Sequence, residues 1–403
     1  MSRNMVRSSG QPDYIFIFIV VCLILLGGLI LVSVSLPISQ EKFGSSFYYL
    51  NHQIIFGLLP GLILAFSAFK IKLVSFKKWA PIFLLINLIF LGMVFLPLIG
   101  VNFRGSARWI NLGPISLQPS EFLKLSFILY LASWLESRTP HQTTTHPPPS
   151  PPNAGPLKFG AGQADKKFTP TTKKLAWWFS QTFFAFLAIM VITGTFLIFQ
   201  PDISTLLVII LVATLMYFLA KTPLWHSILL IFMIILAFLV LIKIAPYRFN
   251  RILVFLNPEL DPMGIGYQIK HALIAIGSGG IFGSGLGLSL QKFGFLPHSI
   301  SDSIFAIFAE ETGFLGSLVL VLLYLVFFWR GLKIGKQTGD NFSKFCAFGT
   351  TFWITLQAFV NIGSMIGILP LTGIPLPFIS YGGSALISEL IGVGILLNIS
   401  KQT

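Results

Sequence analysis

Long apolar runs recur along the whole chain, separated by short polar segments or by segments rich in glycine and proline. Each run has roughly 18–25 residues, enough for a helix to cross a hydrocarbon core about 30 Å thick. Ten such spans are predicted, at about 14–35, 49–68, 79–98, 117–135, 177–199, 203–220, 224–243, 304–328, 346–369 and 383–400. The pattern predicts an all-α integral membrane protein in which residues 1–403 form a single polytopic membrane domain. The first span lacks a small-residue cleavage site and is expected to be retained as a helix.

The charge pattern predicts the orientation of these spans. The chain has 27 Lys and Arg against 13 Asp and Glu. If the N-terminus is cytoplasmic, ten spans leave both termini inside, with eighteen basic residues in inside segments and eight in outside segments. This asymmetry satisfies the positive-inside rule. Because the basic residues lie in short loops between spans, a nucleic-acid partner is not expected.

Cysteine and histidine give no sign of a metal centre. Cys22 and Cys346 fall in different apolar spans and are expected to be packing residues. The six histidines are scattered, and no pair has ligand spacing on one helix face. The residues therefore predict no structural metal.

Two predicted loops are longer than ordinary connections. The first, 137–176, holds a Pro/Thr-rich tract that cannot bury a core, so a disordered cytoplasmic loop is expected. The second, 244–303, is a large extracytoplasmic loop between spans 7 and 8 that should contribute to the active site. Its apolar piece Tyr267–Gly277 is too short to span and is either re-entrant or flat at the interface. The glycine run 277–287 lets backbone approach either a ligand or another helix closely.

Acidic residues within or beside spans are the first candidates for chemistry. An ionisable side chain at bilayer depth costs roughly 2.5–3.5 kcal/mol on insertion scales, so it is rarely kept without a role. Asp302, Glu310 and Glu311 stand at the start of the eighth span. Asp302 lies at the outer interface, where it is either a general base or a cap of the following helix.

Three further segments carry polar candidates. Pro119 fits the first turn of a helix, which places Glu121 and Lys124 on one face, either as a structural ion pair or as groups that face an anion. Asp202 in QPDIST is expected to cap the sixth span. The prolines of 367–389 forbid a continuous helix, so this segment either forms a rigid wall beside a polar site or serves packing alone.

These features converge on the outer face, where an acid, several bases and a stiff wall suit an anionic amphiphile whose tail lies in the membrane. A basic cluster stabilises a phosphate leaving group, and a carboxylate takes a proton from a hydroxyl. The pattern permits glycosyl transfer from a lipid pyrophosphate, and it permits lipid transport as well.

Several motifs make the chain similar to a known family. They are Arg108–Trp109, QPSEFLK at 118–124, QPDIST at 200–205, YQIKHALIAIGSGGIFGSGLG at 267–287 and NIGSMIGILPLTGIPLPFISYGGSAL at 361–386. In these the chain resembles the SEDS family (shape, elongation, division and sporulation), which includes FtsW and RodA, and short local similarities bring it closer to FtsW. The resemblance implies a ten-helix bundle that polymerises lipid II into peptidoglycan strands on the outer face of the bacterial cytoplasmic membrane. It implies an inverting glycosyl transfer with undecaprenyl pyrophosphate as leaving group, for division or elongation.

The resemblance also implies partners and site residues. The expected partners are the lipid II substrate, a class B penicillin-binding protein, other divisome or elongasome proteins and membrane lipid. Asp302 matches the family's essential aspartate and is the expected catalytic residue. Substrate binding is expected from Arg108, Gln118, Glu121, Lys124, Lys292, Ser380 and Tyr381. No cofactor is assigned, and a divalent cation, Mg²⁺ or Mn²⁺, stays open.

The chain departs from the family pattern at two acidic positions. His298 follows Pro297 where the family usually has glutamate, and Glu389 in the last span has no counterpart. Two other functions stay open beside the polymerase: a lipid II flippase and a non-enzymatic scaffold. A flippase should place charge along a path through the bilayer midplane, whereas Asp302, Arg108 and most outer bases are predicted near one surface.

Overall fold

The computed structural model describes residues 10–96, 100–103, 106–111, 113, 116–138, 172–220, 222, 225–226, 228–233, 236 and 246–402. Within these residues, nine of the ten predicted spans are helical, and most of the span predicted at 224–243 lies outside them. The bundle helices are α1 (Tyr14–Phe43), α2 (Tyr48–Gln53) continued by η1 (Ile54–Leu58) and α3 (Leu59–Lys70), α4 (Leu73–Met93), α5 (Pro119–Arg138), α6 (Thr172–Phe199), α7 (Ile203–Leu219), α11 (Ile304–Gln337), α12 (Asn341–Met365) and α13 (Gly383–Ser400).

Length and composition make most of these helices candidates for membrane spans. Six segments of the described chain are long and apolar enough to cross a membrane, and Phe183–Phe199 and Ile203–Leu219 are shorter apolar helices. α5 differs because it carries four charged side chains, at Glu121, Lys124, Glu136 and Arg138. Most of the loop predicted at 137–176 lies outside the described residues, since α5 ends at 138 and α6 begins at 172.

Capping groups fix where several helices begin and end. Asp13 starts α1 by accepting a hydrogen bond from the backbone nitrogen of Phe16 at 3.1 Å. Asp202 starts α7 in the same way, as predicted, and Asp340 starts α12. α1 ends at Gly44, whose φ of 65° favours glycine. α1 extends beyond its predicted end at 35 because the helix continues until the cap at Gly44, and α11 extends beyond its predicted end at 328 to Gln337.

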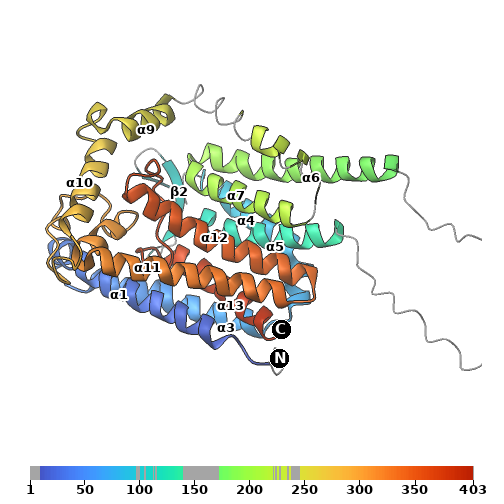
Figure 1. Ribbon diagram of the computed structural model, residues 1–403, viewed down its shortest axis with the longest axis horizontal. Helices are drawn as coiled ribbons and strands as arrows, with labels where there is room; N and C mark the ends of the chain where they lie inside the picture. Colours follow the sequence, from blue (N-terminus) through green and yellow to red (C-terminus); the bar gives the residue numbers. More distant parts are fainter. Residues whose placement is uncertain are drawn as a thin grey trace, which may run out of the picture.

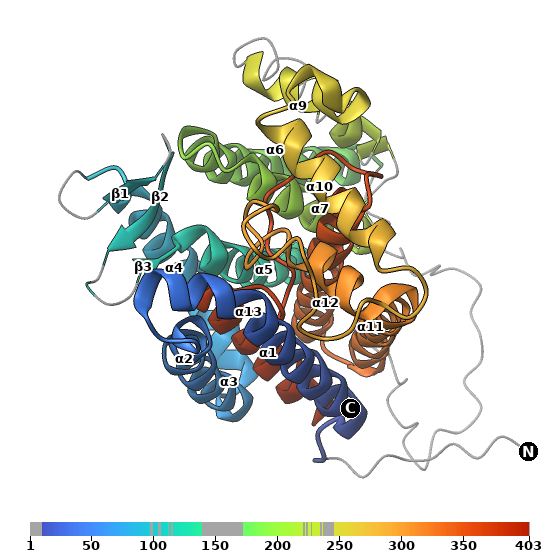
Figure 2. The same ribbon diagram turned by 90° about the vertical axis from the view of Figure 1, so that its left-hand side faces the viewer.

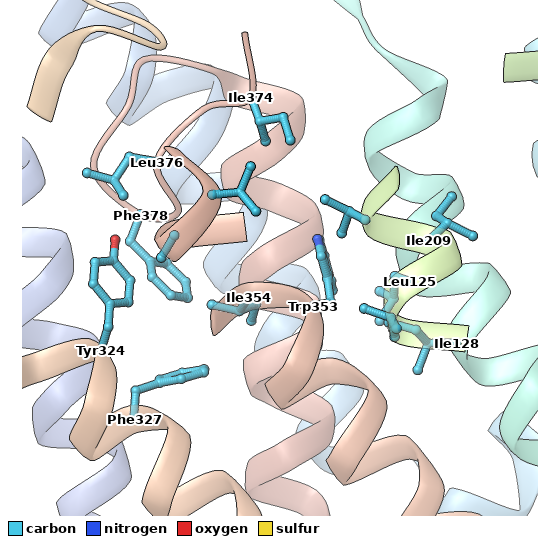
Figure 3. Close-up of a cluster of buried hydrophobic side chains, with 14 of the residues drawn as sticks. Leu125, Ile128, Ile209, Tyr324, Phe327, Trp353, Ile354, Ile374, Leu376 and Phe378 are labelled. Carbon is cyan, nitrogen blue, oxygen red and sulfur yellow. The ribbon is translucent and has the colours of Figure 1, made fainter. Parts of the chain in front are cut away.

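The core of the bundle is built around α12, which packs against α5, α7, α11 and α13. Figure 3 shows Trp353 and Ile354 of α12 between Leu125 and Ile128 on one side and Phe327 on the other. Because lipid is as apolar as these side chains, close packing rather than burial from water holds such helices together. Gly349 illustrates this: a Cβ there would lie 2.6 Å from Ile128 and from Met216.

A small antiparallel sheet stands in the segment between α4 and α5, as an addition to the predicted all-α bundle. Its strands are β1 (Gly100–Phe103), β2 (Ser106–Asn111) and β3 (Ser116–Leu117), in the order β1-β2-β3. Phe103 pairs with Ser106, and a register shift follows Val101. Two short runs separated by two residues are a hairpin signal, which hydropathy windows of membrane length average away.

The predicted large loop 244–303 is structured where it is described, and it covers one end of the bundle. It contains α9 (Pro246–Leu256), the short 3₁₀ helix η2 (Pro258–Leu260), α10 (Ile265–Ser278) and the turn-rich segment 279–303. α10 contacts α11 and lies across the end of the bundle (Figure 1). Figure 2 looks onto this end, with the sheet at the left edge and α9 at the top.

The glycine run brings backbone close to a helix of the same chain. A Cβ on Gly279 would lie 2.2 Å from the carbonyl oxygen of Ala309, and one on Gly283 would lie 2.2 Å from that of Glu311. α11 is interrupted at this point by Gly313, whose φ is 68°. Of the two predictions for the run, close approach to another helix is therefore the one observed.

Candidate functional site

Asp302 is held by its backbone in the turn that precedes α11. The three successive carbonyl oxygens of Ile300, Ser301 and Asp302 each accept a hydrogen bond. The donors are the backbone nitrogen of Tyr381 at 2.9 Å, the hydroxyl of Ser380 at 2.5 Å and the side-chain amide of Asn361 at 2.7 Å. Residues 374–381, called the wall from here, are part of the segment predicted as a wall at 367–389, and they hold the backbone beside the aspartate from a point later in the chain.

The carboxyl of Asp302 is surrounded by hydrogen-bond donors. The hydroxyl of Ser301 donates to Oδ1 at 3.0 Å, and Nε2 of Gln268 lies 3.5 Å from Oδ2. Burial raises the pKa of the Asp302 carboxyl above its ordinary value, while the charge of His298 and these two donors oppose the rise. The alternative role as a helix cap is not observed, since Ser303 occupies the N-cap of α11 and no side chain caps it.

A cavity of about 330 Å³ opens beside Asp302. Its walls come from the sheet, the start of α5, the turn before α7, the large loop and the wall segment. Residues with polar side chains that line it include Arg108, Gln118, Glu121, Asp202, Ser204, Thr205, Arg251, Gln268, His298, Ser301, Asp302 and Tyr381. Five of the predicted site residues therefore meet at one cavity: Asp302, Arg108, Gln118, Glu121 and Tyr381.

Arg108 reaches the cavity from β2 and is anchored on the turn between α6 and α7. Its Nε donates to the carbonyl oxygen of Gln200 at 3.3 Å, and its Nη2 donates to that of Pro201. Asp202 of the same turn is used by α7 as its cap. The QPD sequence therefore ties the sheet to the helices and fixes the guanidinium beside the cavity.

Glu121 and Lys124 form a buried ion pair beneath the cavity floor. The Lys124 Nζ lies 2.7 Å from Oε2 of Glu121 and 2.7 Å from Oε1 of Gln357, and both charged side chains are at most 3% exposed. Gln357 in turn donates its amide to the carbonyl oxygen of Pro375 at 3.0 Å. Glu121 lines the cavity and Lys124 does not. The predicted pairing is observed, and it is coupled to the wall through Gln357.

Two predicted binding residues lie away from the cavity. Lys292 is buried and pairs with Glu311 at 3.3 Å, and its Nζ also donates to Ser33 of α1 at 3.4 Å. Ser380 uses its hydroxyl within the protein, since it donates to Ser301 and accepts from the backbone nitrogen of Leu376 at 2.8 Å. Both side chains therefore stabilise contacts within the protein and do not line the cavity.

Glu310 and Glu311 also anchor the loop. Glu310 accepts hydrogen bonds from the Ser289 hydroxyl and from the backbone nitrogen of Leu290. Glu311 accepts from Ser33 at 2.6 Å in addition to its pairing with Lys292. These two acids of the first turns of α11 therefore join the glycine-rich segment to α11 and α1.

The cavity is also lined by residues that were not among the predicted site residues. Arg251 comes from α9 and donates toward the carbonyl oxygen of Leu371 at 3.5 Å. Gln268 comes from α10, whose YQIKH sequence was singled out only as part of a motif. His298 and Asp202 were noted for other reasons. The placement of Arg251, Gln268 and His298 depends on how the large loop folds back, which no local pattern shows.

Ser301 and Gln268, which contact the Asp302 carboxyl, donate hydrogen bonds to it and carry no charge that would help to hold Mg²⁺ or Mn²⁺. Of the other two buried acids of the cavity, Glu121 has Lys124 on Oε2 and Asp202 uses Oδ1 to cap α7. Across the described ranges no three His, Cys, Asp or Glu side chains gather as a metal site would need. What the cavity offers is one carboxylate with a raised pKa and two arginines, a set suited to proton removal beside an anion.

Relatives of the chain are found along its whole length. The family model of FtsW, RodA and SpoVE cell cycle proteins matches residues 13–403. Stage V sporulation protein E of Bacillus subtilis is 36% identical over 99% of this chain and 100% of its own. A probable peptidoglycan glycosyltransferase FtsW of Nitrosococcus halophilus is 36% identical over 98% of this chain and 94% of its own.

Solved structures share the fold. A chain in a structure described as a peptidoglycan synthase complex that coordinates polymerization and crosslinking aligns with a TM-score of 0.71 and 23% identity, covering 96% of this chain and 97% of that one. Rod shape determining protein RodA of Thermus thermophilus aligns with a TM-score of 0.64 and 24% identity, covering 96% of each chain. At these identities the likeness concerns the fold, and it confirms the predicted helical membrane bundle.

Proposed function

We infer that this chain, which belongs to the FtsW, RodA and SpoVE family of cell cycle proteins, is a peptidoglycan glycosyltransferase that polymerises lipid II into glycan strands. The observation that carries the proposal is the cavity in which Asp302 faces the same space as Arg108 and Arg251. One acid able to accept a proton and two cations able to hold a pyrophosphate are the groups that such a transfer needs.

In the proposed reaction Asp302 is the general base. Its carboxylate takes the proton of the acceptor sugar's hydroxyl while that oxygen attacks the anomeric carbon of the donor. The bond from the anomeric carbon to the lipid pyrophosphate breaks, and the departing oxygen takes the electron pair. A single displacement of this kind inverts the anomeric configuration and releases undecaprenyl pyrophosphate.

The basic groups act on the leaving group. A guanidinium binds phosphate oxygens through paired N–H donors, so Arg108 and Arg251 are the proposed pyrophosphate ligands. Arg108 is preorganised by its bonds to the QPD turn, which lowers the cost of reorientation during the reaction. Gln118, Glu121 and Tyr381 are proposed to contact the sugars, and Lys124 acts through Glu121.

The distribution of charge favours the polymerase over a flippase. A flippase needs polar groups along a path through the midplane. The deep Glu121–Lys124 pair is closed, because the two side chains bond to each other and Lys124 also bonds to Gln357, and the polar cavity is lined by residues of the large loop.

We further propose that this end faces the outside of the bacterial cytoplasmic membrane, with both termini in the cytoplasm. The predicted excess of basic residues at the other end supports that orientation. A class B penicillin-binding protein is the proposed partner that crosslinks the product. The relatives named FtsW support a role in division, with elongation as the second possibility.

The decisive experiment incubates the purified protein with lipid II, alone and with its transpeptidase partner, and separates the products by size. Glycan chains that form with the wild type and are absent with Asp302→Asn are expected. A flippase would instead move labelled lipid II across vesicle membranes without making chains, and that result would replace the proposal.

A further inference from the structure

Glu389 is a deeply buried acid for which the proposed reaction has no use. It lies on α13 and is 1% exposed. Its Oε2 accepts a hydrogen bond from the backbone nitrogen of Phe378 at 2.8 Å, and its Oε1 has no hydrogen-bond partner among the described residues. A buried acid with a single bond, made to the backbone of a non-helical segment, points to a function in shaping that segment.

Phe378 has an unusual backbone conformation at the bend of the wall. Its φ is 65°, in the left-handed region that residues with a Cβ rarely adopt. The flanking groups hold the same bend: the Tyr324 hydroxyl donates to the carbonyl oxygen of Pro377 at 2.5 Å. Figure 3 shows Tyr324 pointing toward the segment that carries Leu376 and Phe378, with Phe327 below the Phe378 ring. A strained residue persists only where its surroundings determine it, and the Glu389 carboxyl is the group that binds its N–H.

The bend leads directly to the groups that hold Asp302. The hydroxyl of Ser380, two residues after Phe378, donates to the carbonyl oxygen of Ser301. The backbone nitrogen of the following residue, Tyr381, donates to the carbonyl oxygen of Ile300. If Phe378 relaxed out of the left-handed region, the direction of the chain would change just before these two contacts. The turn that carries Asp302 would then lose two of its three carbonyl partners.

We propose that Glu389 is a positioning residue: by binding the N–H of Phe378 it holds the wall in the bent conformation that places Asp302 at the cavity. The interaction needs an acceptor oxygen at this point and no charge. The effect on turnover rests on the proposed function, whereas the effect on the Phe378 N–H does not.

Two substitutions separate the acceptor from the acid. Glu389→Gln keeps an oxygen for the Phe378 N–H and cannot ionise, while Glu389→Met keeps a similar length and has no such acceptor. Ser388→Ala is the matched control, because the neighbouring buried Ser388 hydroxyl bonds only within α13, to Ala385. Steady-state polymerisation at varied lipid II, thermal unfolding in detergent and hydrogen–deuterium exchange of peptides covering 374–381 are measured for all three.

We expect Glu389→Met to lower kcat by ~10-fold or more with KM within ~2-fold, because a misplaced base slows the chemical step more than it weakens binding. Its Phe378 amide should exchange faster than in the wild type. Glu389→Gln and Ser388→Ala should match the wild type in both measurements. If the Glu389 side chain only filled space, Glu389→Gln and Glu389→Met would have the same effect. Normal behaviour of Glu389→Gln alone therefore supports the hydrogen bond to Phe378.

Two outcomes overturn the inference. One is a Glu389→Gln variant that unfolds normally yet loses as much activity as Glu389→Met, since the acid itself would then be required. The other is an unchanged exchange rate of the Phe378 amide in Glu389→Met. If no variant polymerises lipid II, including the wild type, the proposed function fails, and the exchange comparison still decides whether Glu389 holds the bend.

Discussion

Asp302 is the proposed base, and its buried position disfavours the ionised form of its carboxyl. Burial raises the pKa of this carboxyl, and the charge of His298 with the Ser301 and Gln268 donors opposes the rise. A base with a raised pKa binds the transferred proton more strongly, which suits general base catalysis near neutral pH. The same shift makes the reaction sensitive to acid.

The first prediction concerns the pH dependence of catalysis. The base must be ionised, so kcat/KM should fall as pH falls through the raised pKa of Asp302, at a higher pH than the ~3.9 of an ordinary aspartate. Asp302→Asn should fold and insert normally but lose ~10²-fold or more of its activity and show no such acidic limb. A pH profile of glycan synthesis for both proteins checks this. Near-normal synthesis by Asp302→Asn would remove the assignment.

The second prediction is that His298 sets the pH at which kcat/KM falls on the acidic side of the profile, called the acidic limb. A cationic imidazole stabilises the Asp302 carboxylate and lowers its pKa, so His298→Gln should move the acidic limb to higher pH. His271→Gln is the control, because His271 lies in the same loop, bonds to Gln291 and does not line the cavity. A limb that stays in place in His298→Gln, or moves equally in His271→Gln, would contradict the pairing of His298 with Asp302.

At the scale of single residues, the sequence showed which residues belong to the site better than it showed which side chains pair with one another. The rarity of acids pointed to Asp302, and the motif residues Arg108, Gln118, Glu121 and Tyr381 meet it at one cavity. Lys292 looked equally suitable as an outer base, yet it pairs with Glu311. Nothing local distinguishes a lysine that faces a ligand from one that faces a buried acid nineteen residues later, because the choice depends on how the loop packs on α11.

Among the elements, α12 makes two of the polar contacts that hold the wall, and α5 is connected to the wall through α12. α5 contributes Glu121 and Lys124, and α12 contributes Gln357 and Asn361, which hold the carbonyl oxygens of Pro375 and Ile374. The sequence predicted the helices from their lengths and the Glu121–Lys124 pair from its spacing. It could not predict Gln357 as the third partner, because that residue is 233 positions away.

The third prediction is that Glu121 and Lys124 are energetically coupled. Removing one charge leaves the other buried and unpaired, so Glu121→Gln or Lys124→Met alone should each cost about 3–5 kcal/mol of stability. The double variant should cost clearly less than the sum of the two. Thermal unfolding in detergent across the double-mutant cycle measures this, and fully additive effects would show that the pair is not coupled.

The fourth prediction tests the contact between the glycine run and α11. Gly279→Ala places a Cβ 2.2 Å from the Ala309 carbonyl oxygen, so the segment must shift, at a cost of about 1–3 kcal/mol. Gly277→Ala is the control two residues earlier, since a Cβ there meets no atom within 4 Å. Unfolding temperatures should separate the two variants. Equal stability would mean that the loop does not pack on α11 as closely as the structure has it.

Over the whole molecule, the polar cavity and the chain termini lie at opposite ends. The backbone nitrogen of Gly10 donates to the carbonyl oxygen of Lys401, and that of Asp13 donates to Ser400, so both ends of the described chain meet beyond the last turn of α13. α13 begins beside the cavity, at Gly382, which lines it. Hydropathy and charge predicted this two-ended layout, whereas the sheet and the folded-back loop that close the cavity depend on contacts distant in sequence.

The last prediction follows from that separation. α5 reaches the cavity with Glu121 in its first turn and ends at Arg138, about 25 Å further along its axis, and the segment predicted as a Pro/Thr-rich loop begins there. Replacing residues 139–171 by a flexible Gly/Ser linker should therefore leave lipid II polymerisation within ~2-fold of the wild type, because no group at the cavity is touched. Membrane insertion and unfolding temperature serve as controls. A correctly inserted linker variant that had lost polymerisation would show that this segment acts on the site from the opposite end of the bundle.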